Sequence, residues 1–267
     1  MDFDFELIAS PFRMQPGLRR LAVADRHLTP LRADSAIARE KRQVLQGGTA
    51  RLAVAGFDPA PALAAVRDQA ALDGVPDSPA TVFPELAVEE DLAVLDGDTG
   101  TLPWLCVCLP SHWSPEDKLG LDFASVHRPV ADNRLLIGAG RQLVSLATSG
   151  ERWERHVWTI SPSGRHDQHP RRQPRTPWPD TADVEAFANA CFLRAERQTF
   201  FPVGRGTRQA VFTIRVMLEP LAVAVDTARK AQLLQAGLAS MSPEVLRYKG
   251  LEDAREPLLQ WLAARTA

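Results

Sequence analysis

The stretch "GRGTRQAVFTIRVML", residues 204–218, decides the fold of this chain. Its "GRG" at 204–206 is typical of a hairpin turn. The following "QAVFTIRVML", residues 209–218, is rich in the β-branched and aromatic residues that favour strands. A tight turn joins antiparallel strands, because parallel strands need a long crossover. We therefore expect an antiparallel sheet built largely from the second half of the chain.

Two further segments indicate strands. "TLPWLCVCLP", residues 101–110, has the continuous apolar pattern of a buried strand, and "RHVWTIS", residues 155–161, alternates with a period of two. The same period puts Cys106 and Cys108 on one face, where we expect small core residues. No repeating strand–helix rhythm is present, which argues against a doubly wound parallel sheet. The predicted fold class is α+β, with four or five strands.

Helical patterns occupy much of the remaining chain. Gly120 interrupts the segment 114–127, which is therefore expected as two short turns after Ser114 and Pro115. The other predicted helices are 34–45 with Asp34 as its cap, 60–72, 85–95, 133–149, 183–200 and three more after residue 219. Residues 1–32 are expected as an extended arm and 162–181 as a Pro- and Arg-rich loop. We expect one domain over 1–267, with an arm and helices over 1–95, a core over 96–220 and helices over 221–267.

The composition bounds the function. Of 267 residues, 45% are hydrophobic and 24% charged, the balance of an ordinary globular protein that needs no disulfides. A formal net charge of -2 gives no reason to expect nucleic acid or an anionic membrane as a partner. No apolar run approaches the roughly 18 residues of a membrane span. The start, "MDFDFELIASPF", carries acidic residues where a signal peptide carries basic ones. We therefore expect a cytoplasmic protein.

Several catalytic and cofactor motifs are absent from the sequence. There is no G-x-S-x-G elbow, no P-loop and no H-E-x-x-H pair. "GAGRQL" at 138–143 lacks the third glycine of a dinucleotide fingerprint. The three cysteines match neither an iron–sulfur cluster nor a covalent haem attachment site. The chain thus carries no flavin, nicotinamide or iron–sulfur motif of its own.

The histidine of greatest interest is His127, at the end of the short apolar stretch "LDFASV" and just before "RPV". Two interpretations are open. A protonated imidazole could simply lie at a helix C-terminus, where the helix dipole favours it. Alternatively, a neutral imidazole could project into a pocket as a ligand. His27 is expected at the surface, and His166 and His169 in a solvated loop.

Two clusters of charge accompany the strands. Arg197 lies in "RAERQTFF", and Arg215 lies inside the apolar strand, where an arginine requires an anionic partner. That partner is either Glu196 or Glu219 in an ion pair, or a cofactor carboxylate gripped by the guanidinium fork. Arg155 and His156 lie in "ERWERHVW", which is either a solvated strand edge or a pocket wall.

These segments, in their order, resemble the haem-dependent oxidative N-demethylase α-subunit family, long described as a domain of unknown function. The likeness extends from about residue 11 to 222, so Tyr248, the only tyrosine, lies beyond it. The most specific blocks are "PSHW…DKLG…VHRPV" and "ERQT…FTIR". The full set is "PFRMQPGLRRL", "ELAVEEDLAVL", "CLPSHWSPEDKLGLDFASVHRPV", "RWERHVWTI" and "RAERQTFFPVGRGTRQAVFTIRVMLEPL".

The resemblance implies a PAS-like antiparallel sheet with helical N- and C-terminal extensions. It also implies a b-type haem, iron protoporphyrin IX, with His127 as the proximal ligand of the metal. Arg155, Arg197 and Arg215 are then expected at the haem propionates or on the substrate side of the pocket. Glu196 would orient one of these arginines. The catalytic candidates are Arg155, Glu196 and Arg197, and the cofactor-binding candidates are His127, His156, Arg197 and Arg215.

The implied activity is oxidative removal of a methyl group from a small secondary amine such as dimethylamine, with release of formaldehyde. Dioxygen would be the co-substrate. Because the chain has no motif for electron delivery, we expect either a separate flavin or iron–sulfur reductase or the use of peroxide, and a homo-oligomer is possible. The Arg-rich loop could be the surface on which the reductase docks, or it could be merely a solvated loop. Two other functions stay open: a PAS-type sensor that binds haem or another small ligand, and an interaction module with no cofactor.

Overall fold

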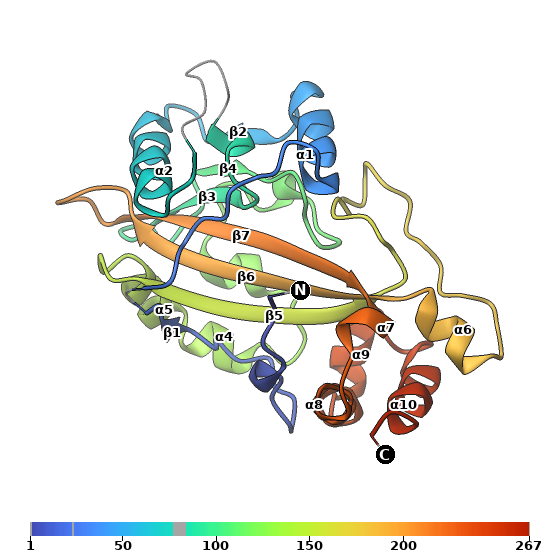
Figure 1. The fold of residues 1–267 in the computed structure, drawn as a ribbon. Helices are drawn as coiled ribbons and strands as arrows, with labels where there is room; N and C mark the ends of the chain where they lie inside the picture. Colours follow the sequence, from blue (N-terminus) through green and yellow to red (C-terminus); the bar gives the residue numbers. More distant parts are fainter. Residues whose placement is uncertain (1, 23, 77–83, 267) are drawn as a thin grey trace.

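Two long strands joined by a hairpin form the centre of the molecule. In the computed structural model, which describes residues 2–22, 24–76 and 84–266, these are β6 (Phe192–Pro202) and β7 (Gln209–Pro220). They pair antiparallel along their whole length, from Phe192 opposite Pro220 to Pro202 opposite Ala210. The hairpin expected around residues 204–206 is confirmed, and the two strands run across the middle of Figure 1.

Five shorter strands complete a seven-stranded sheet in the order β1-β5-β6-β7-β3-β4-β2. They are β1 (Arg19–Arg20), β2 (Arg51–Ala53), β3 (Asp91–Asp96), β4 (Trp104–Cys106) and β5 (Trp153–Ser161). Every neighbouring pair is antiparallel. The α+β class with an antiparallel sheet is therefore confirmed.

Helices cover both faces and one end of this sheet. In Figure 1, α1 (Ala36–Gln46) and α2 (Ala60–Leu72) lie above the long strands, with α4 (Arg134–Gly138) and α5 (Gly140–Ala147) below them. The C-terminal helices gather beyond one end of β5 and β6. The others are α3 (Phe123–His127), α6 (Val184–Asn189), α7 (Leu221–Ala224), α8 (Ala228–Ala239), α9 (Pro243–Lys249) and α10 (Arg255–Ala263), with short 3-10 turns η1 (Phe5–Leu7), η2 (Pro84–Leu86) and η3 (Pro115–Asp117).

Two buried clusters account for most of the core. The first packs α1 and α2 against the strands through residues such as Val44, Val66 and Val94. The second packs α6 to α10 and the start of the chain against the ends of β5 and β6, and it includes Phe5 and the fully buried Trp261. Cys106 and Cys108 are buried, as expected of small core residues.

The helix expected over 85–95 is wrong. Only η2 (Pro84–Leu86) turns there, and β3 (Asp91–Asp96) follows as a strand between β7 and β4. Leu92, Val94 and their neighbours are buried on both faces of the sheet, so the apolar residues do not alternate with polar ones. A short continuous apolar run of this kind cannot be told from a buried helix by periodicity.

The helix expected over 183–200 is right only at its start. Asp183 caps α6 by accepting from the backbone amides of Glu185 and Ala186, and the helix ends at Asn189. β6 begins at Phe192, where the helical spacing predicted three more turns. Pairing with β5 on one side and β7 on the other overrides local propensity in this segment.

Other boundaries differ by smaller amounts. Ser35, rather than Asp34, caps α1 through a hydrogen bond from the amide of Ala38. The segment 114–127 forms two turns as expected, and Gly120 between them has the positive φ of 71° that separates them. Within the described residues, no helix is long and apolar enough to cross a membrane.

Candidate functional site

The register of the central strands divides the predicted site residues between two faces of the sheet. His156 lies opposite Arg197, and Arg197 lies opposite Arg215, so these three form one cross-strand row. Arg155 lies opposite Gln198 in the adjacent row. Since successive side chains of a strand point to opposite faces, the two rows face opposite ways. We call the face with His156, Arg197 and Arg215 the paired face, and the face with Arg155, Glu196 and Gln198 the site face.

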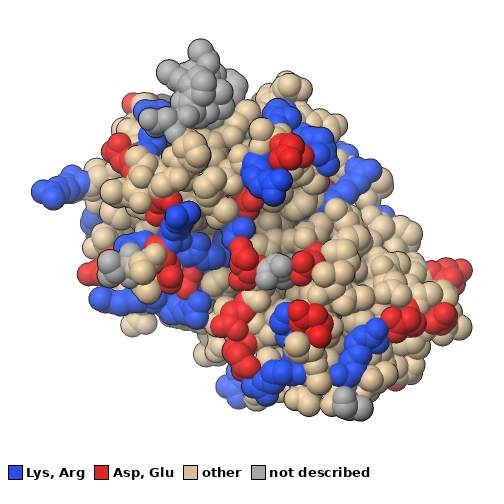
Figure 2. Space-filling view, in the orientation of Figure 1, with Lys and Arg blue, Asp and Glu red and all other residues tan. Residues whose placement is uncertain are grey.

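On the paired face the guanidinium groups already have carboxylate partners. Arg197 Nε donates to Glu154 Oε2 at 2.9 Å, and Arg19 holds the other oxygen of Glu154 at 2.8 Å. Arg215 Nε donates to Glu89 Oε2 at 2.7 Å, so its partner is neither Glu196 nor Glu219 among the interactions described. The N-terminal arm crosses this face, where Figure 2 shows basic and acidic side chains interspersed.

His156 is also enclosed on the paired face. The centroid of its ring lies 6.3 Å from the centroid of the Phe3 ring. Burial lowers the pKa of His156 to about 4, and the nearby arginines Arg19 and Arg197 act in the same direction, against Glu154. His156, Arg197 and Arg215 are therefore held in a salt-bridged layer beneath the arm, away from the residues of the site face.

On the site face Arg155 has no hydrogen-bonded carboxylate among the interactions described, unlike Arg197 and Arg215. Its buried Nε has no hydrogen-bond partner within the described residues. Burial lowers the pKa of Arg155, and the attraction of Glu196 opposes this shift. Arg155 is half-buried, and a buried donor atom without a partner is costly because it loses its hydration without gaining a hydrogen bond. The Nε of Arg155 is therefore a hydrogen-bond donor that no described group of the chain uses.

Glu196 is held in a fixed position on the same face. Its Oε1 accepts from the hydroxyl of Ser111, and its Oε2 accepts from the amide of Gln198 at 2.8 Å. Glu196 is 8% exposed. Because both of its oxygens accept hydrogen bonds, the contacts suit an ionised carboxylate.

His127 ends α3, the helix that Asp122 caps by accepting from the amide of Ser125 at 2.7 Å. Its Nδ1 lies 2.8 Å from the carbonyl oxygen of Phe123, and the two rings stack with centroids 4.1 Å apart. Phe123 is in turn packed against α5 at Gly140, where a Cβ atom would come within 3.0 Å of the phenyl ring. This chain of contacts sets the orientation of the imidazole.

The protonation of His127 follows from its surroundings. Burial lowers the pKa of His127, and Arg155 and Lys118 lower it further, while the hydrogen bond to the carbonyl of Phe123 acts the other way. The imidazole is therefore neutral at pH 7. With Nδ1 donating to that carbonyl, the lone pair is on Nε2, which makes no hydrogen bond to a described residue.

Helix α9 brings two further residues to this site. The hydroxyl of Ser242, which caps α9, donates to Asp132 at 2.7 Å and ties α9 to the loop after His127. Tyr248 lies within electrostatic range of Arg155 and Glu196. The Nζ of Lys249 donates to the carbonyl of Trp158 on β5 at 2.7 Å, and burial lowers the pKa of Lys249 to about 8.

The sequence missed Ser111, Tyr248 and Lys249 as candidates. Ser111 lies within the quoted "CLPSHW" block, but a lone serine there carries no catalytic motif. Tyr248 is the only tyrosine in the sequence, which could have drawn notice to it. Its position late in the chain, however, gave no reason to expect it near β5. Only the fold places α9 beside Arg155.

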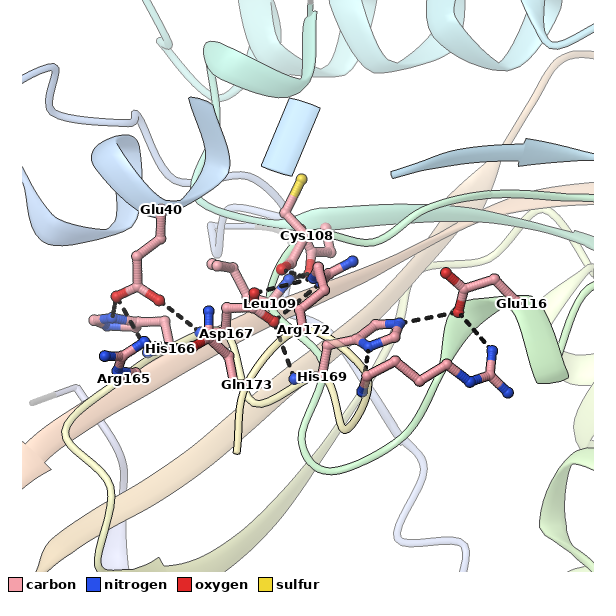
Figure 3. A network of polar contacts seen from close by, with 12 residues as sticks. Glu40, Cys108, Leu109, Glu116, Arg165, His166, Asp167, His169, Arg172 and Gln173 are labelled. Atoms are coloured by element: carbon pink, nitrogen blue, oxygen red, sulfur yellow. Dashed lines mark hydrogen bonds and ion pairs between the residues drawn. The ribbon is translucent and has the colours of Figure 1, made fainter. Parts of the chain in front are cut away.

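The two histidines of the Arg-rich loop contact carboxylates instead of lying in solvent, whereas Arg165, Arg171 and Arg175 of the same loop are exposed as expected. His166 contacts Glu40 of α1 at 3.2 Å, and His169, 2% exposed, contacts Glu116 at 2.9 Å, as Figure 3 shows. Arg172 pairs with Asp167 at 3.0 Å and also donates to the carbonyl of Cys108. The loop is thus clamped between α1 and η3, and much of its positive charge is neutralised internally.

Two other features lie away from the site face. His27, expected at the surface, is 1% exposed and packs against Phe201. A cavity of about 460 Å³ opens beside Arg26, Asp73 and Arg152. None of the candidate site residues is among those that line this cavity, and it contains no histidine.

The residues of the site face fit a haem. A single neutral histidine with Nδ1 bonded to a backbone carbonyl and Nε2 free is the usual proximal arrangement. The unpartnered Nε of Arg155 supplies a donor for a propionate carboxylate. Among the described residues, no three His, Cys, Asp or Glu side chains gather to hold a bare metal ion, whereas a haem needs one axial histidine.

The structure defines an α+β domain with an antiparallel sheet, in which His127 lies within electrostatic range of Arg155. The particular family is given by comparison with family models. Residues 69–259 match the haem-dependent oxidative N-demethylase, alpha subunit-like family, and the chain belongs to it. The match includes His127, Arg155, Glu196 and, unlike the resemblance noted from the sequence, Tyr248. No curated protein matches the chain significantly.

Proposed function

We propose that the chain binds a b-type haem through Nε2 of His127 and demethylates a small secondary amine oxidatively. The observation that carries the proposal is the geometry of His127, whose Nδ1 bonds to the Phe123 carbonyl while Nε2 has no described partner. Arg155, with its unpartnered Nε, would hold a propionate. The domain would span residues 1–267 as one PAS-like unit.

When bound, the haem would supply the centre at which dioxygen is activated. The net reaction takes the secondary amine, O2, two electrons and two protons to a carbinolamine and water. The carbinolamine then splits into formaldehyde and the primary amine. A separate flavin or iron–sulfur reductase would supply the electrons, since the sequence carries no motif for either group.

The chain's own residues would bind and orient the substrate. A dimethylamine-like substrate is a cation at neutral pH. The Glu196 carboxylate, on the same face as Arg155, has the opposite charge and could bind this cation. Tyr248, in range of Glu196 and Arg155, would close the same side of the site. His156, Arg197 and Arg215 would act only on the stability of the sheet, because their carboxylate contacts lie on the opposite face.

The proposal is tested with the His127→Ala variant. Haem titration of the parent protein is expected to give a Soret band, and loss of the axial ligand is expected to weaken haem binding at least about 100-fold, by analogy with loss of a metal ligand. His156→Ala, on the paired face, is the matched control and should retain the band. Full haem binding by His127→Ala would contradict the ligand assignment. A haem protein that releases no formaldehyde from dimethylamine with a reductase and NADPH would favour the sensing function instead.

A further inference from the structure

Ser111 links two buried charged residues of the site face. Its hydroxyl oxygen accepts from Nε of Arg194 at 2.7 Å and its proton is donated to Oε1 of Glu196. A guanidinium can only donate, and a hydroxyl has one proton. The direction of the chain Arg194, Ser111, Glu196 is therefore unambiguous.

Arg194 is anchored on every side. It is 1% exposed and donates to the carbonyl oxygens of Leu109 at 3.1 Å, His166 at 2.9 Å and Arg165 at 3.2 Å. Burial lowers the pKa of Arg194 to about 10, so the group stays charged at neutral pH. The hydroxyl of Ser111 bridges Arg194 and Glu196, and the positive guanidinium attracts the negative carboxylate.

The backbone around Ser111 is held as firmly as the side chain. The amide of Gln168 donates to the carbonyl of Pro110 at 3.1 Å, and Ser111 forms a β-bridge with Gln168. The next residue, His112, has a φ of 59°, in the left-handed region that a non-glycine residue rarely adopts. Such a conformation persists only where the surroundings enforce it, and it is common at functional sites.

We propose that Ser111 is a positioning residue for Glu196. Its hydroxyl, held by Arg194, fixes which way the carboxylate faces across the site toward Arg155 and Tyr248. The inference rests on the proposed function in one respect: it takes Glu196 as the group that receives the cationic amine. Ser111 itself touches neither the haem nor the amine in this assignment.

The first test is independent of haem and substrate. Ser111→Ala, Glu196→Leu and the double variant are compared by urea unfolding of the haem-free protein. Because the two groups are in direct contact, Ser111→Ala should lower the urea midpoint in the parent by at least about twice as much as in the Glu196→Leu background. Additive shifts would overturn the positioning role, whatever the function of the protein.

The second test measures ligand binding. Dimethylammonium chloride is titrated into the ferric haem protein, and the dissociation constant is taken from the Soret shift. Ser111→Ala is expected to weaken amine binding about ten-fold, the loss typical of a hydrogen bond to a charged group, without changing haem affinity. Ser111→Thr keeps the hydroxyl and should restore binding to within about two-fold of the parent.

The control is Ser163→Ala, which removes a serine hydroxyl from the loop after β5, the loop that bridges to Ser111 at Gln168; this hydroxyl accepts from the amide of Arg165 and has no described contact with Glu196. It should leave amine binding unchanged. If Ser111→Ala binds the amine normally while Glu196→Gln does not, the positioning role is wrong and the proposed function stands. If Glu196→Gln binds normally, the amine assignment of the proposed function is wrong, and the unfolding cycle alone decides the role of Ser111.

Discussion

The two faces of the central sheet carry the same kinds of residue and use them differently. On the paired face, Arg197 and Arg215 each have a carboxylate oxygen within 3 Å, and the half-buried His156 beside them has a pKa lowered to about 4 by burial. On the site face, Arg155 has a buried nitrogen without a partner, and the neutral His127 has a free Nε2. The first arrangement is satisfied by the chain itself. The second leaves two nitrogen atoms without a partner among the described residues, which is the basis of the proposed haem site.

This contrast explains why a charged residue in a strand is a poor guide to function until its hydrogen-bond and ion-pair partners are known. Arg155 and Arg197 are both arginines in apolar strands, and both were candidates for the same role. A buried ion pair is weak evidence for a contribution to stability, and it gives no evidence that a ligand binds. A buried polar atom without a partner, by contrast, requires an explanation. Substitutions on the two faces should therefore have opposite signatures.

The largest effect on stability is expected from Arg197→Met. It leaves the carboxylate of Glu154, 4% exposed, with Arg19 as its only described ion-pair partner. Breaking a buried pair from one side should lower the free energy of unfolding by about 3 kcal/mol. Urea unfolding of the haem-free protein measures this loss.

The control for Arg197→Met is Arg208→Met, which breaks the exposed pair of Arg208 with Asp98. Exposed pairs contribute little, so its effect should be below about 1 kcal/mol. Equal losses in the two variants would mean that the paired face is not the stabilising layer described here. Haem affinity should be unchanged in both.

An intermediate effect is expected from His156 as the pH falls. The pKa of His156 is lowered to about 4 by burial, against about 6.5 in an unfolded chain. Between these values the unfolded chain binds the proton and the folded protein does not, so stability is complete above about pH 6.5 and is lost as the pH falls toward 4. From pH 7 to 4.5 the loss from this group is about 2 kcal/mol.

His156→Gln removes that titration. Its free energy of unfolding should therefore fall by about 2 kcal/mol less than that of the parent between pH 7 and 4.5. His27, whose pKa is likewise lowered to about 4 by burial, is present in both proteins, so the difference isolates His156. Parallel pH profiles for the two proteins would show that His156 is not held neutral.

The smallest effect is expected from Arg155→Met, and it has the opposite sign in stability. Removing a half-buried cation whose buried Nε has no partner should leave the unfolding free energy unchanged or raise it by about 1 kcal/mol. Haem affinity should fall about ten-fold, the loss typical of a charge-assisted hydrogen bond. Arg155→Lys, which keeps the charge, is the control. A stability loss as large as that of Arg197→Met would show that Arg155 is structural.

Much of the fold could be predicted from local pattern. The hairpin at 204–206, the helix over 60–72 and the two turns either side of Gly120 were expected from residue types alone, because each depends on neighbours in sequence. The strand at 91–96 and the change from α6 to β6 could not be predicted in this way. Both segments are strands because other strands pair with them on both sides.

The site divides along the same line. The residues of the "ASVHRPV" block determine that an imidazole ends a short helix, and the resemblance carried by the quoted segments indicated the family that residues 69–259 match. Which of Arg155 and His156 shares a face of the sheet with Glu196, and which with Arg197, was decided only by the tertiary structure. Adjacent residues of a strand point to opposite faces, and nothing local says which face a helix will cover until the strands pair and the core packs.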